Sequence, residues 1–409
     1  MIQQESILDL LIAGGGYVGL SLALALKQAD PTIDVAVVDM RPRAAIEKDG
    51  RASAIAAAAK RMLDQLGVWD DIAGHAQPIN DMIVTDSKLR DAVRPVFLTF
   101  ADATSDNEPF AHMVPNNKMV AALYDKAEAL GVEMISPDGV LSFDISQNEV
   151  QIGLQSGRSL KARLLIAADG VNSRLRSLAG IKTTRWDYGQ SGIVTTVEHE
   201  RPHNGRAEEH FLPSGPFAIL PLVGNRSSLV WTEKTREADR LVKGDDFTFE
   251  IELERRFGHH LGKLKADGPR RAFPLGLTLA RDFVRHRFAL AGDSAHGIHP
   301  IAGQGLNLGF RDVAALAEVI ITARRLGQDI GALDVLEKYQ QWRRFDTWQM
   351  GVVTDVLNRL FSNDNDLIRA ARDFGLGLVD RLPPLKKYFM QEAAGRDAKA
   401  PKLLSGDAL

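Results

Sequence analysis

A glycine-rich segment near the start of the chain constrains the fold most strongly. Three glycines stand in the pattern Gly14-x-Gly16-x-x-Gly19. The segment before them, Ile7–Ala13, is short and mostly apolar, as is typical of a buried parallel strand. The segment after them, Leu20–Ala29, has the composition of a helix. A strand, a glycine turn and a helix in this order predict the start of a Rossmann-like βαβ unit.

Each glycine of this motif has a physical task in binding a dinucleotide. Gly14 allows the tight turn, Gly16 lets the backbone approach a pyrophosphate, and Gly19 lets helix and strand pack closely. Val35–Val38 predicts the second strand, and Asp39 at its end is placed to bind a ribose 2′-hydroxyl. These features favour FAD or NAD over a dinucleotide with a 2′-phosphate. The alternative is a glycine-rich turn with a purely structural role.

Composition excludes several other chemistries. The 409 residues include no cysteine, which rules out disulfides, thiol nucleophiles, iron–sulfur clusters and cysteine-ligated zinc. No metal site is predicted. A net charge of −3 argues against a nucleic-acid partner. No signal peptide or membrane-spanning segment is visible, so we expect a soluble, cytoplasmic protein.

The rest of the chain predicts an α/β fold with an inserted second domain. An alanine-rich helix is expected over Ala52–Leu66, a hairpin over 140–154 and a buried strand over Leu164–Ala168. Strands and turns dominate from Thr183 to Asp282, which predicts a mainly antiparallel sheet. Three of its strands, and one later strand of the parallel sheet, are predicted at Ile193–Val197, Phe217–Leu222, Leu229–Thr232 and Phe288–Ala291.

The C-terminal part is predicted to be helical. Helices are expected over Asp312–Arg325 and Leu333–Phe361, and Pro383-Pro384 should end the helical tail. The expected Rossmann-like domain comprises residues 1–75, 110–182 and 283–335. The expected sheet domain comprises residues 76–109 and 183–282, and the C-terminal helical region residues 336–409.

Three further segments, taken with the glycine loop, carry a resemblance to a known family. Asp169–Arg176 and Gly292–His296 each follow a predicted strand, and His299–Asp312 runs into a helix. Gly215–Leu222 lies between them in the sheet domain. In this order the segments resemble the aromatic-ring flavoprotein monooxygenases. Within that group the chain is similar to the ubiquinone-biosynthesis FAD-dependent hydroxylases, which oxidise polyprenylated phenols.

The resemblance implies which residues bind FAD. The ADP-binding loop and its ribose acid would be Gly14, Gly16, Gly19 and Asp39. Arg51 would reach the cofactor, and Asp169 with Gly170 would serve both FAD and the nicotinamide donor. Asp293, after Gly292, would hydrogen-bond the ribityl chain. The turn beside the flavin ring would be Gly303, Gln304, Gly305, Leu306 and Asn307.

Some of these residues have simpler structural alternatives. Asp169 could belong to a simple turn and Asp293 could cap a helix. For His296 and His299 the favoured interpretation is a packed scaffold role.

The resemblance also implies the reaction. Such enzymes hydroxylate an aromatic ring through a flavin C4a-hydroperoxide, with O₂ as co-substrate and NADH, NADPH or a protein carrier as electron donor. An apolar floor for the substrate is expected in the sheet domain. Its candidates, each also a plausible core residue, are Phe211, Phe217, Leu220, Pro221 and Trp231, together with Pro300 from the later loop.

Two other classes stay open at this point. One is an FAD-dependent reductase or dehydrogenase, which shares the FAD loop but inserts no oxygen. The other is a flavin-binding scaffold subunit of a quinone-biosynthesis complex. Because the implied substrate is lipid-soluble, peripheral membrane contact and a partner protein that carries the substrate are further expectations.

Overall fold

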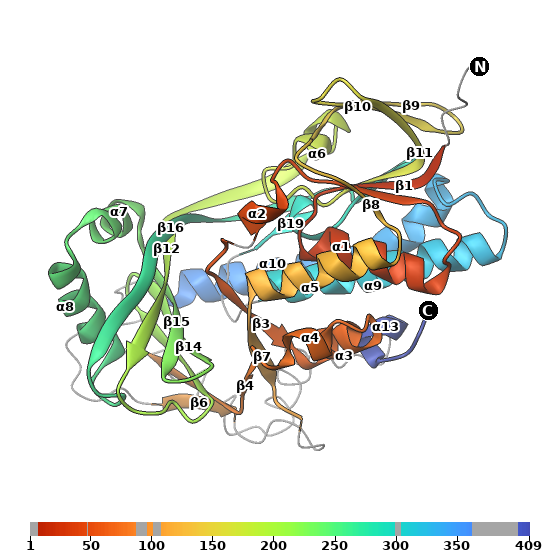
Figure 1. Cartoon of the computed structure of the whole chain (residues 1–409). Coiled ribbons are helices and arrows are strands. Elements are labelled where there is room, and N and C mark those ends of the chain that lie inside the picture. Colours follow the sequence, from red (N-terminus) through yellow and green to blue (C-terminus); the bar gives the residue numbers. More distant parts are fainter. Residues whose placement is uncertain (1–6, 47, 87–95, 101–107, 299–303, 362–399) are drawn as a thin grey trace.

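The chain folds as an α/β structure in which a parallel sheet with its helices adjoins an antiparallel sheet (Figure 1). The computed structural model describes residues 7–46, 48–86, 96–100, 108–298, 304–361 and 400–409. For Asp86, Gln304, Val353 and residues 96–100 and 357–361 it describes the backbone alone. The predicted fold class is confirmed.

The parallel sheet is built from the predicted βαβ unit. Its strand order is β17-β18-β11-β1-β2-β8. These strands are Val284–Arg285 (β17), Phe288–Leu290 (β18), Ser159–Ala167 (β11), Leu8–Ala13 (β1), Val35–Val38 (β2) and Glu133–Ile135 (β8). In β1, Ile12 lies opposite Ile166 on one side and Val37 on the other. Because both faces of this sheet are covered, its strands are continuous apolar runs, which is why the sequence revealed them.

Helices cover one face of this sheet, and a β-hairpin pairs with its strand β11. The hairpin consists of β9 (Val140–Ile145) and β10 (Val150–Leu154), as predicted, and β10 pairs with β11. The helices α1 (Tyr17–Ala29), α5 (Asn116–Ala129) and α9 (Gln304–Arg325) lie in one layer below the sheet in Figure 1. Together they enclose the main hydrophobic core.

The predicted helix over Ala52–Leu66 is wrong in its first third. Residues Ala52–Ala56 form a strand, β3, and the helix α3 begins only at Ala57 and ends at Gln65. Alanine favours helices locally, but β3 pairs antiparallel with β7 (Ala111–Pro115), which also pairs with β4 (Gln77–Ile79). Tertiary pairing therefore overrides the local propensity.

The second large sheet is mainly antiparallel, with the order β19-β16-β12-β15-β14-β13-β5-β6. Its strands are His296–Gly297 (β19), Leu264–Ala280 (β16), Thr183–His199 (β12), Arg226–Lys234 (β15), Gly215–Leu222 (β14), Arg206–Leu212 (β13), Asp81–Asp86 (β5) and Val96–Phe100 (β6). Its one parallel pair joins β13 and β5. Helices α7 (Thr235–Lys243) and α8 (Asp246–Phe257) cover its outer face, away from the parallel sheet (Figure 1).

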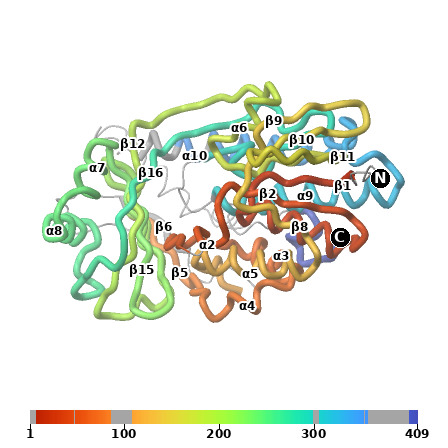
Figure 2. The backbone as a smooth tube through the Cα atoms, turned by 45° about the horizontal axis from the view of Figure 1, so that its top comes forward, coloured from red at the N-terminus to blue at the C-terminus, as the bar shows by residue number. Residues whose placement is uncertain are grey.

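Two long strands and one long helix connect the two parts. The strands β12 and β16 pair along most of their length and run from the outer sheet towards the parallel sheet (Figure 2). The helix α10, predicted correctly over Leu333–Phe361, contacts α9 and β17 and also β14 and β16. Near its C-terminal end, Asp355 accepts a hydrogen bond from the Tyr188 hydroxyl of β12 at 2.9 Å.

The remaining described elements are short. They are α2 (Arg43–Ile46), α4 (Trp69–Ala73), α6 (Arg174–Leu178), the 3₁₀ turn η1 (Gly292–Ser294) and α13 (Lys402–Ser405). The C-terminal α13 packs against α3 and α9. Pro383-Pro384, predicted to end the helical tail, lies outside the described residues.

Candidate functional site

The glycine loop has the geometry that a bound pyrophosphate requires. Gly14 has φ +123°, and a Cβ atom there would lie 2.2 Å from the carbonyl oxygen of Ala168. A Cβ atom at Gly19 would lie 1.9 Å from the carbonyl oxygen of Gly14, so α1 and β1 pack too closely for any side chain. At Gly16, by contrast, a Cβ atom would meet no atom of the described residues within 4 Å. The space above Gly16 is therefore open for a ligand.

The N-terminus of α1 faces this open space. Gly16 is the N-cap residue, and none of the side chains that the structure describes makes a capping hydrogen bond there. The first N–H groups of a helix carry a partial positive charge and bind phosphate well. The loop therefore fits the pyrophosphate of FAD.

Asp39 is tied to the glycine loop rather than left open. Its Oδ2 accepts the backbone N–H of Gly15 at 2.7 Å, and its Oδ1 accepts the backbone N–H of Arg41 at 2.7 Å. The Arg41 guanidinium adds two hydrogen bonds of 3.2 Å, one to each oxygen. Four donors use the acceptor sites of a carboxylate, so a ribose hydroxyl would have to replace the exposed Arg41 side chain.

A cavity of about 600 Å³ lies between the nucleotide loop and the antiparallel sheet. It brings together four parts of the predicted cofactor site, namely Arg51, Asp293, Gly305 and Leu306. Tyr17, which stands in the glycine motif itself, also lines it. A cavity of this size is in the range of small-molecule sites.

Arg51 links the two sides of the cavity. Its Nη2 bonds the Asp49 carboxylate at 2.7 Å, and its guanidinium carbon lies 5.4 Å from the centre of the Phe273 ring on β16. A cation this close to an aromatic face is attracted to it. Arg51 thus lies between the expected cofactor region and the sheet.

Asp293 lies in the η1 turn at the cavity wall. Burial raises the pKa of Asp293, and the nearby His296 and Arg51 counteract this only in part. Gly292 before it has φ +65° and packs against Val18 of α1. A carboxylate held in this environment is suited to accept hydroxyl hydrogen bonds from a polyol such as the ribityl chain.

Asp169 and Gly170 lie beside the loop but not in the cavity wall. Asp169 is exposed, and its Oδ2 is 3.4 Å from the backbone nitrogen of Leu175 in α6. Gly170 has φ +87°, as a turn requires. The cap of α6 is Ser173, whose hydroxyl accepts the Arg176 N–H at 3.0 Å. The role of this pair towards FAD stays a prediction.

The predicted flavin-side turn divides into three parts. Gly303 lies outside the described residues, as does the substrate-pocket candidate Pro300, and of Gln304 the backbone alone is described. Gly305 and Leu306 line the cavity. The Asn307 side chain instead holds β3, because it accepts the Ala56 N–H at 2.9 Å and donates to the Ala54 carbonyl at 2.9 Å.

The predicted substrate residues fall on both faces of the antiparallel sheet. Leu220 lines the cavity, together with its neighbour Ala218 on β14. Phe217 alternates with them and points the other way, into the core beneath α7 and α8. Pro221 has the same alternation as Phe217 and does not line the cavity.

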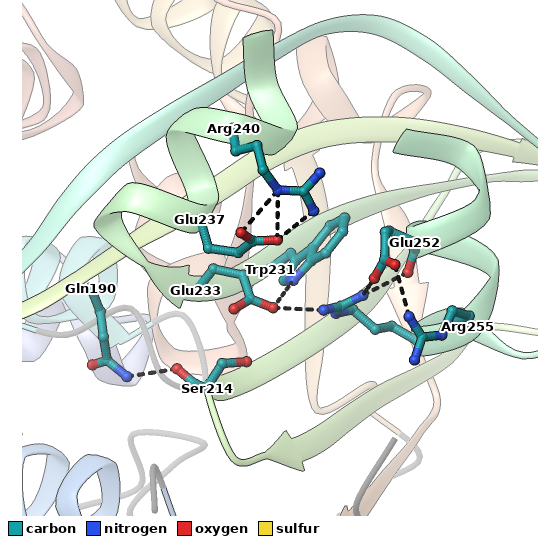
Figure 3. A network of polar contacts seen from close by, with 9 residues as sticks. Gln190, Ser214, Trp231, Glu233, Glu237, Arg240, Glu252 and Arg255 are labelled. Carbon is teal, nitrogen blue, oxygen red and sulfur yellow. Dashed lines mark hydrogen bonds and ion pairs between the residues drawn. The ribbon is translucent and has the colours of Figure 1, made fainter. Parts of the chain in front are cut away.

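Trp231 on β15 lies in that outer core as well, with its ring centroid 5.8 Å from that of Phe217. Its Nε1 donates to Glu233 at 3.0 Å, in a polar network that includes Glu252 (Figure 3). Phe211 is buried on β13 and does not line the cavity. The expectation that Phe217 and Trp231 form the pocket floor is therefore corrected: the sheet's alternation turns them away.

Several cavity residues escaped the sequence analysis. Side chains on four strands line the cavity: Met82 on β5, Ala207 and Glu209 on β13, Ala218 on β14 and Val230 on β15. Period-2 alternation from Leu220 places Ala218 on the same face, but a small side chain gives little signal of a pocket in the sequence. Across the described ranges, no group of three metal-ligating side chains is present, and no helix is both long and apolar enough to cross a membrane.

Comparison with known proteins agrees with this geometry. A family model described as "FAD binding domain" matches residues 8–351. The chain is 44% identical over 409 residues to ubiquinone hydroxylase UbiL of Rhodospirillum rubrum, covering 98% of this chain and 94% of that protein. It is 34% identical over 400 residues to 3-demethoxyubiquinol 3-hydroxylase of Escherichia coli, covering 95% of this chain and 98% of that protein.

Solved structures support the fold. The p-nitrophenol 4-monooxygenase PnpA from Pseudomonas putida superposes with a TM-score of 0.79 at 20% identity, covering 97% of this chain and 100% of that one. At this identity the likeness concerns the fold alone.

Proposed function

The chain belongs to the FAD binding domain family and to its ubiquinone-biosynthesis hydroxylases, and on that premise we propose that it hydroxylates the aromatic ring of a polyprenylated phenol. The observation that carries the proposal is the cavity of about 600 Å³. One wall holds Tyr17, Arg51 and Asp293, and a second wall holds Ala218 and Leu220 of the antiparallel sheet. A flavin on the first wall would lie next to a ring on the second.

The first wall would hold FAD through groups of known geometry. The N–H groups at the start of α1 would bind the pyrophosphate above Gly16. Asp39 would bind the adenosine ribose, and Asp293 the ribityl hydroxyls. Gly305 and Leu306 would lie beside the flavin ring. When bound, FAD supplies the redox chemistry, in which its reduced form activates O₂ and transfers one oxygen atom to the ring.

The second wall would orient the phenol. Ile79, Met82, Leu220 and Val230 give it an apolar surface suited to a ring and a prenyl chain. Such a surface also excludes water, which would otherwise divert the activated oxygen. Trp186, which lines the cavity and is 49% exposed, marks a path by which a long tail would leave the site.

Polar groups in the cavity would fix the position of the ring. Ser53, Asn116, Arg185 and Glu209 interrupt the apolar lining. A few hydrogen-bonding groups in a mostly apolar pocket orient a ligand and discriminate against analogues that lack its hydroxyls. These groups would decide which ring carbon faces the flavin.

The glycine motif bears on the electron donor, and the substrate class bears on membrane contact and partners. The sequence contains one G-x-G-x-x-G motif and no sign of a second Rossmann domain, so NADH or NADPH would dock transiently or a protein carrier would deliver electrons. We propose a cytoplasmic location, and a lipid-soluble phenol favours peripheral membrane contact or a partner in a quinone-biosynthesis complex. Flotation with liposomes, with and without partner proteins, tests that contact; no association in either case argues against it.

The test of the proposed function begins with the purified protein and added FAD. A flavin spectrum should appear, and NADH, NADPH or a reductase with its carrier should support oxygen uptake that a prenylated phenol stimulates. No bound flavin would overturn the proposal. Substrate reduction without oxygen uptake would identify a reductase, and bound flavin without turnover under any donor would identify a scaffold.

A further inference from the structure

A fully buried carboxylate lies directly behind the turn that carries Asp293. Asp312 belongs to α9 and is 0% exposed. Its Oδ2 accepts the backbone N–H of Gly292 at 2.9 Å and faces Nε2 of His296 at 2.6 Å. Its Oδ1 accepts Nε–H of Arg343, from α10, at 2.9 Å. One side chain thus joins three separate elements.

Charge explains why Asp312 can be buried there. An isolated carboxylate in the interior is costly, so it needs a cation and hydrogen-bond donors. Arg343, itself 2% exposed, supplies the cation and also pairs with Asp346 at 2.8 Å. The contacts with Arg343 and His296 lower the pKa of Asp312 against the opposing effect of burial. Asp312 is therefore an ionised acceptor.

The Oδ2 atom of Asp312 holds both ends of one short segment. Gly292 begins the η1 turn, and His296, in β19, follows it. Asp293, which lines the cavity, lies between these two contacts. Gly309 of α9 packs against the start of this segment, since a Cβ atom there would lie 3.7 Å from Cα of Gly292 and 2.8 Å from Cγ2 of Val18. The segment has little freedom to place Asp293 elsewhere.

We propose that Asp312 is a positioning residue for the cofactor: by binding Gly292 and His296 together, with Arg343 holding its other oxygen, it aims the Asp293 carboxylate at the flavin side chain. This inference rests on the proposed function, since it needs FAD in the cavity. It adds residues of α9 and α10 that touch neither cofactor nor substrate. The reaction would depend on them through the orientation of Asp293.

The chain offers a matched pair of variants at His296. The His296 Nδ1 atom has no partner among the described residues, so its Nε2 contact to Asp312 is the one that counts. In His296→Gln the amide nitrogen takes the place of Nε2 and keeps the donor. In His296→Leu the donor is lost while an apolar side chain fills the space. A direct variant is Asp312→Asn.

The experiment measures the FAD dissociation constant, the flavin midpoint potential and the thermal midpoint of the cofactor-free protein. We expect FAD to bind about tenfold more weakly to His296→Leu and Asp312→Asn, with a shifted flavin potential, and within about twofold of wild type to His296→Gln. A control is Glu233→Gln in the outer sheet, where the buried Glu233 Oε1 accepts a hydrogen bond from Nη2 of Arg256 at 3.0 Å. This control should lower the thermal midpoint and leave FAD affinity unchanged.

Each outcome decides the matter. If His296→Leu lowers the thermal midpoint yet binds FAD like wild type, the network is merely structural and the inference fails. If His296→Gln is as weak as His296→Leu, the donor to Asp312 is not the cause and the inference also fails. Should Asp312→Asn not fold, the His296 pair still decides. If wild type binds no FAD, the proposed function itself falls, whereas bound FAD with unchanged variants overturns the positioning role alone.

Discussion

The Oδ2 atom of Asp39 accepts the backbone N–H of Gly15 at 2.7 Å, so the acid at the end of β2 is fixed to the turn after β1. The pairing of β1 and β2 sets this contact, because Gly14 also donates its N–H to the Val38 carbonyl at 2.7 Å. The Arg41 side chain donates the remaining two hydrogen bonds to the Asp39 carboxylate. In the proposed complex, the cofactor ribose would therefore compete with Arg41 for this carboxylate.

This competition predicts the effect of Arg41→Gln. Because the Arg41 side chain is exposed, its ion pair with the buried Asp39 is worth about 1 kcal/mol, so removing it should strengthen FAD binding by up to about fivefold. A fluorescence titration of the cofactor-free protein with FAD measures the change. Weaker binding in Arg41→Gln would mean that Arg41 contacts the cofactor instead of blocking it.

Gly16→Val should separate cofactor binding from folding. Gly16 has extended backbone, φ −84° and ψ −177°, and open space where a side chain would stand, so valine fits the empty protein. The same side chain would occupy the pyrophosphate position and remove at least two hydrogen bonds to charged oxygens. We expect FAD to bind about 100-fold more weakly with an unchanged thermal midpoint of the empty protein.

The matched control for this variant is Gly19→Ala. Its Cβ would collide with the Gly14 carbonyl, so this variant should lose stability as well as affinity. Normal FAD loading of Gly16→Val would contradict the assignment of the loop.

Asp293→Asn should weaken FAD binding and stabilise the FAD-free protein against unfolding. Burial raises the pKa of Asp293, so in the folded protein its charge is unfavourable above the folded pKa, and this cost disappears as the pH falls below the unfolded value near 3.8. The neutral variant should therefore unfold at higher temperature than wild type at pH 7, when both lack FAD. It should also bind FAD about tenfold more weakly, for loss of a charged acceptor.

Calorimetry of both proteins at pH 7 and pH 4 checks this prediction, because the stability difference should shrink at the lower pH. Unchanged FAD affinity in Asp293→Asn would remove Asp293 from the site.

Neighbouring positions on β14 should behave in opposite ways. Ala218→Trp adds bulk to the cavity, so KM for a prenylated phenol should rise about tenfold or turnover should stop, while FAD affinity and stability stay close to wild type. Phe217→Ala opens a hole in the outer core and should cost about 3–5 kcal/mol of unfolding free energy. Equal kinetic effects of the two variants would refute the assignment of sheet faces.

Glu208→Gln should reveal an acid-dependent contribution to stability. Burial alone would raise the pKa of Glu208, but hydrogen bonds from His210 and His260 outweigh it and lower the pKa to about 2. A lowered carboxyl pKa stabilises the fold above the unfolded value near 4.5, and this contribution is lost as the pH falls from about 4.5 to about 2. The variant should lose about 1–2 kcal/mol near pH 6.

Urea unfolding between pH 2 and pH 6 measures the Glu208 effect. The two unfolding curves should converge towards the acid end. A difference that is constant with pH would show that ionisation of Glu208 has no part in it.

The sequence was informative where the signal is local. The βαβ unit, the hairpin of β9 and β10 and the helix α10 were predictable, since apolar periodicity and glycine turns act within a few residues. The strand β3 was not, because its alanines favour a helix. What makes it a strand is pairing with β7 and the side chain of Asn307, which lies 251 residues further along.

The sequence predicts which segments line the cavity but not which of their side chains face it. Leu220, Asp293 and Gly305, which the sequence singles out, line the cavity, whereas the large aromatic candidates Phe217 and Trp231 lie in the outer core. Both faces of β14 are covered, so hydrophobicity alone could not distinguish the cavity face from the face beneath α7 and α8. The sequence does not predict the partners of Asp312 either, since Arg343 comes from a different helix.

The most direct test of the central claim is the fate of oxygen during turnover. The FAD-loaded protein, supplied with NADH, NADPH or a carrier system and a prenylated phenol, would be run under oxygen-18 gas and its product analysed by mass spectrometry. The account predicts a ring-hydroxylated product that carries one labelled oxygen atom. A product without the label, or a reduced prenyl chain in place of a hydroxylated ring, would contradict it.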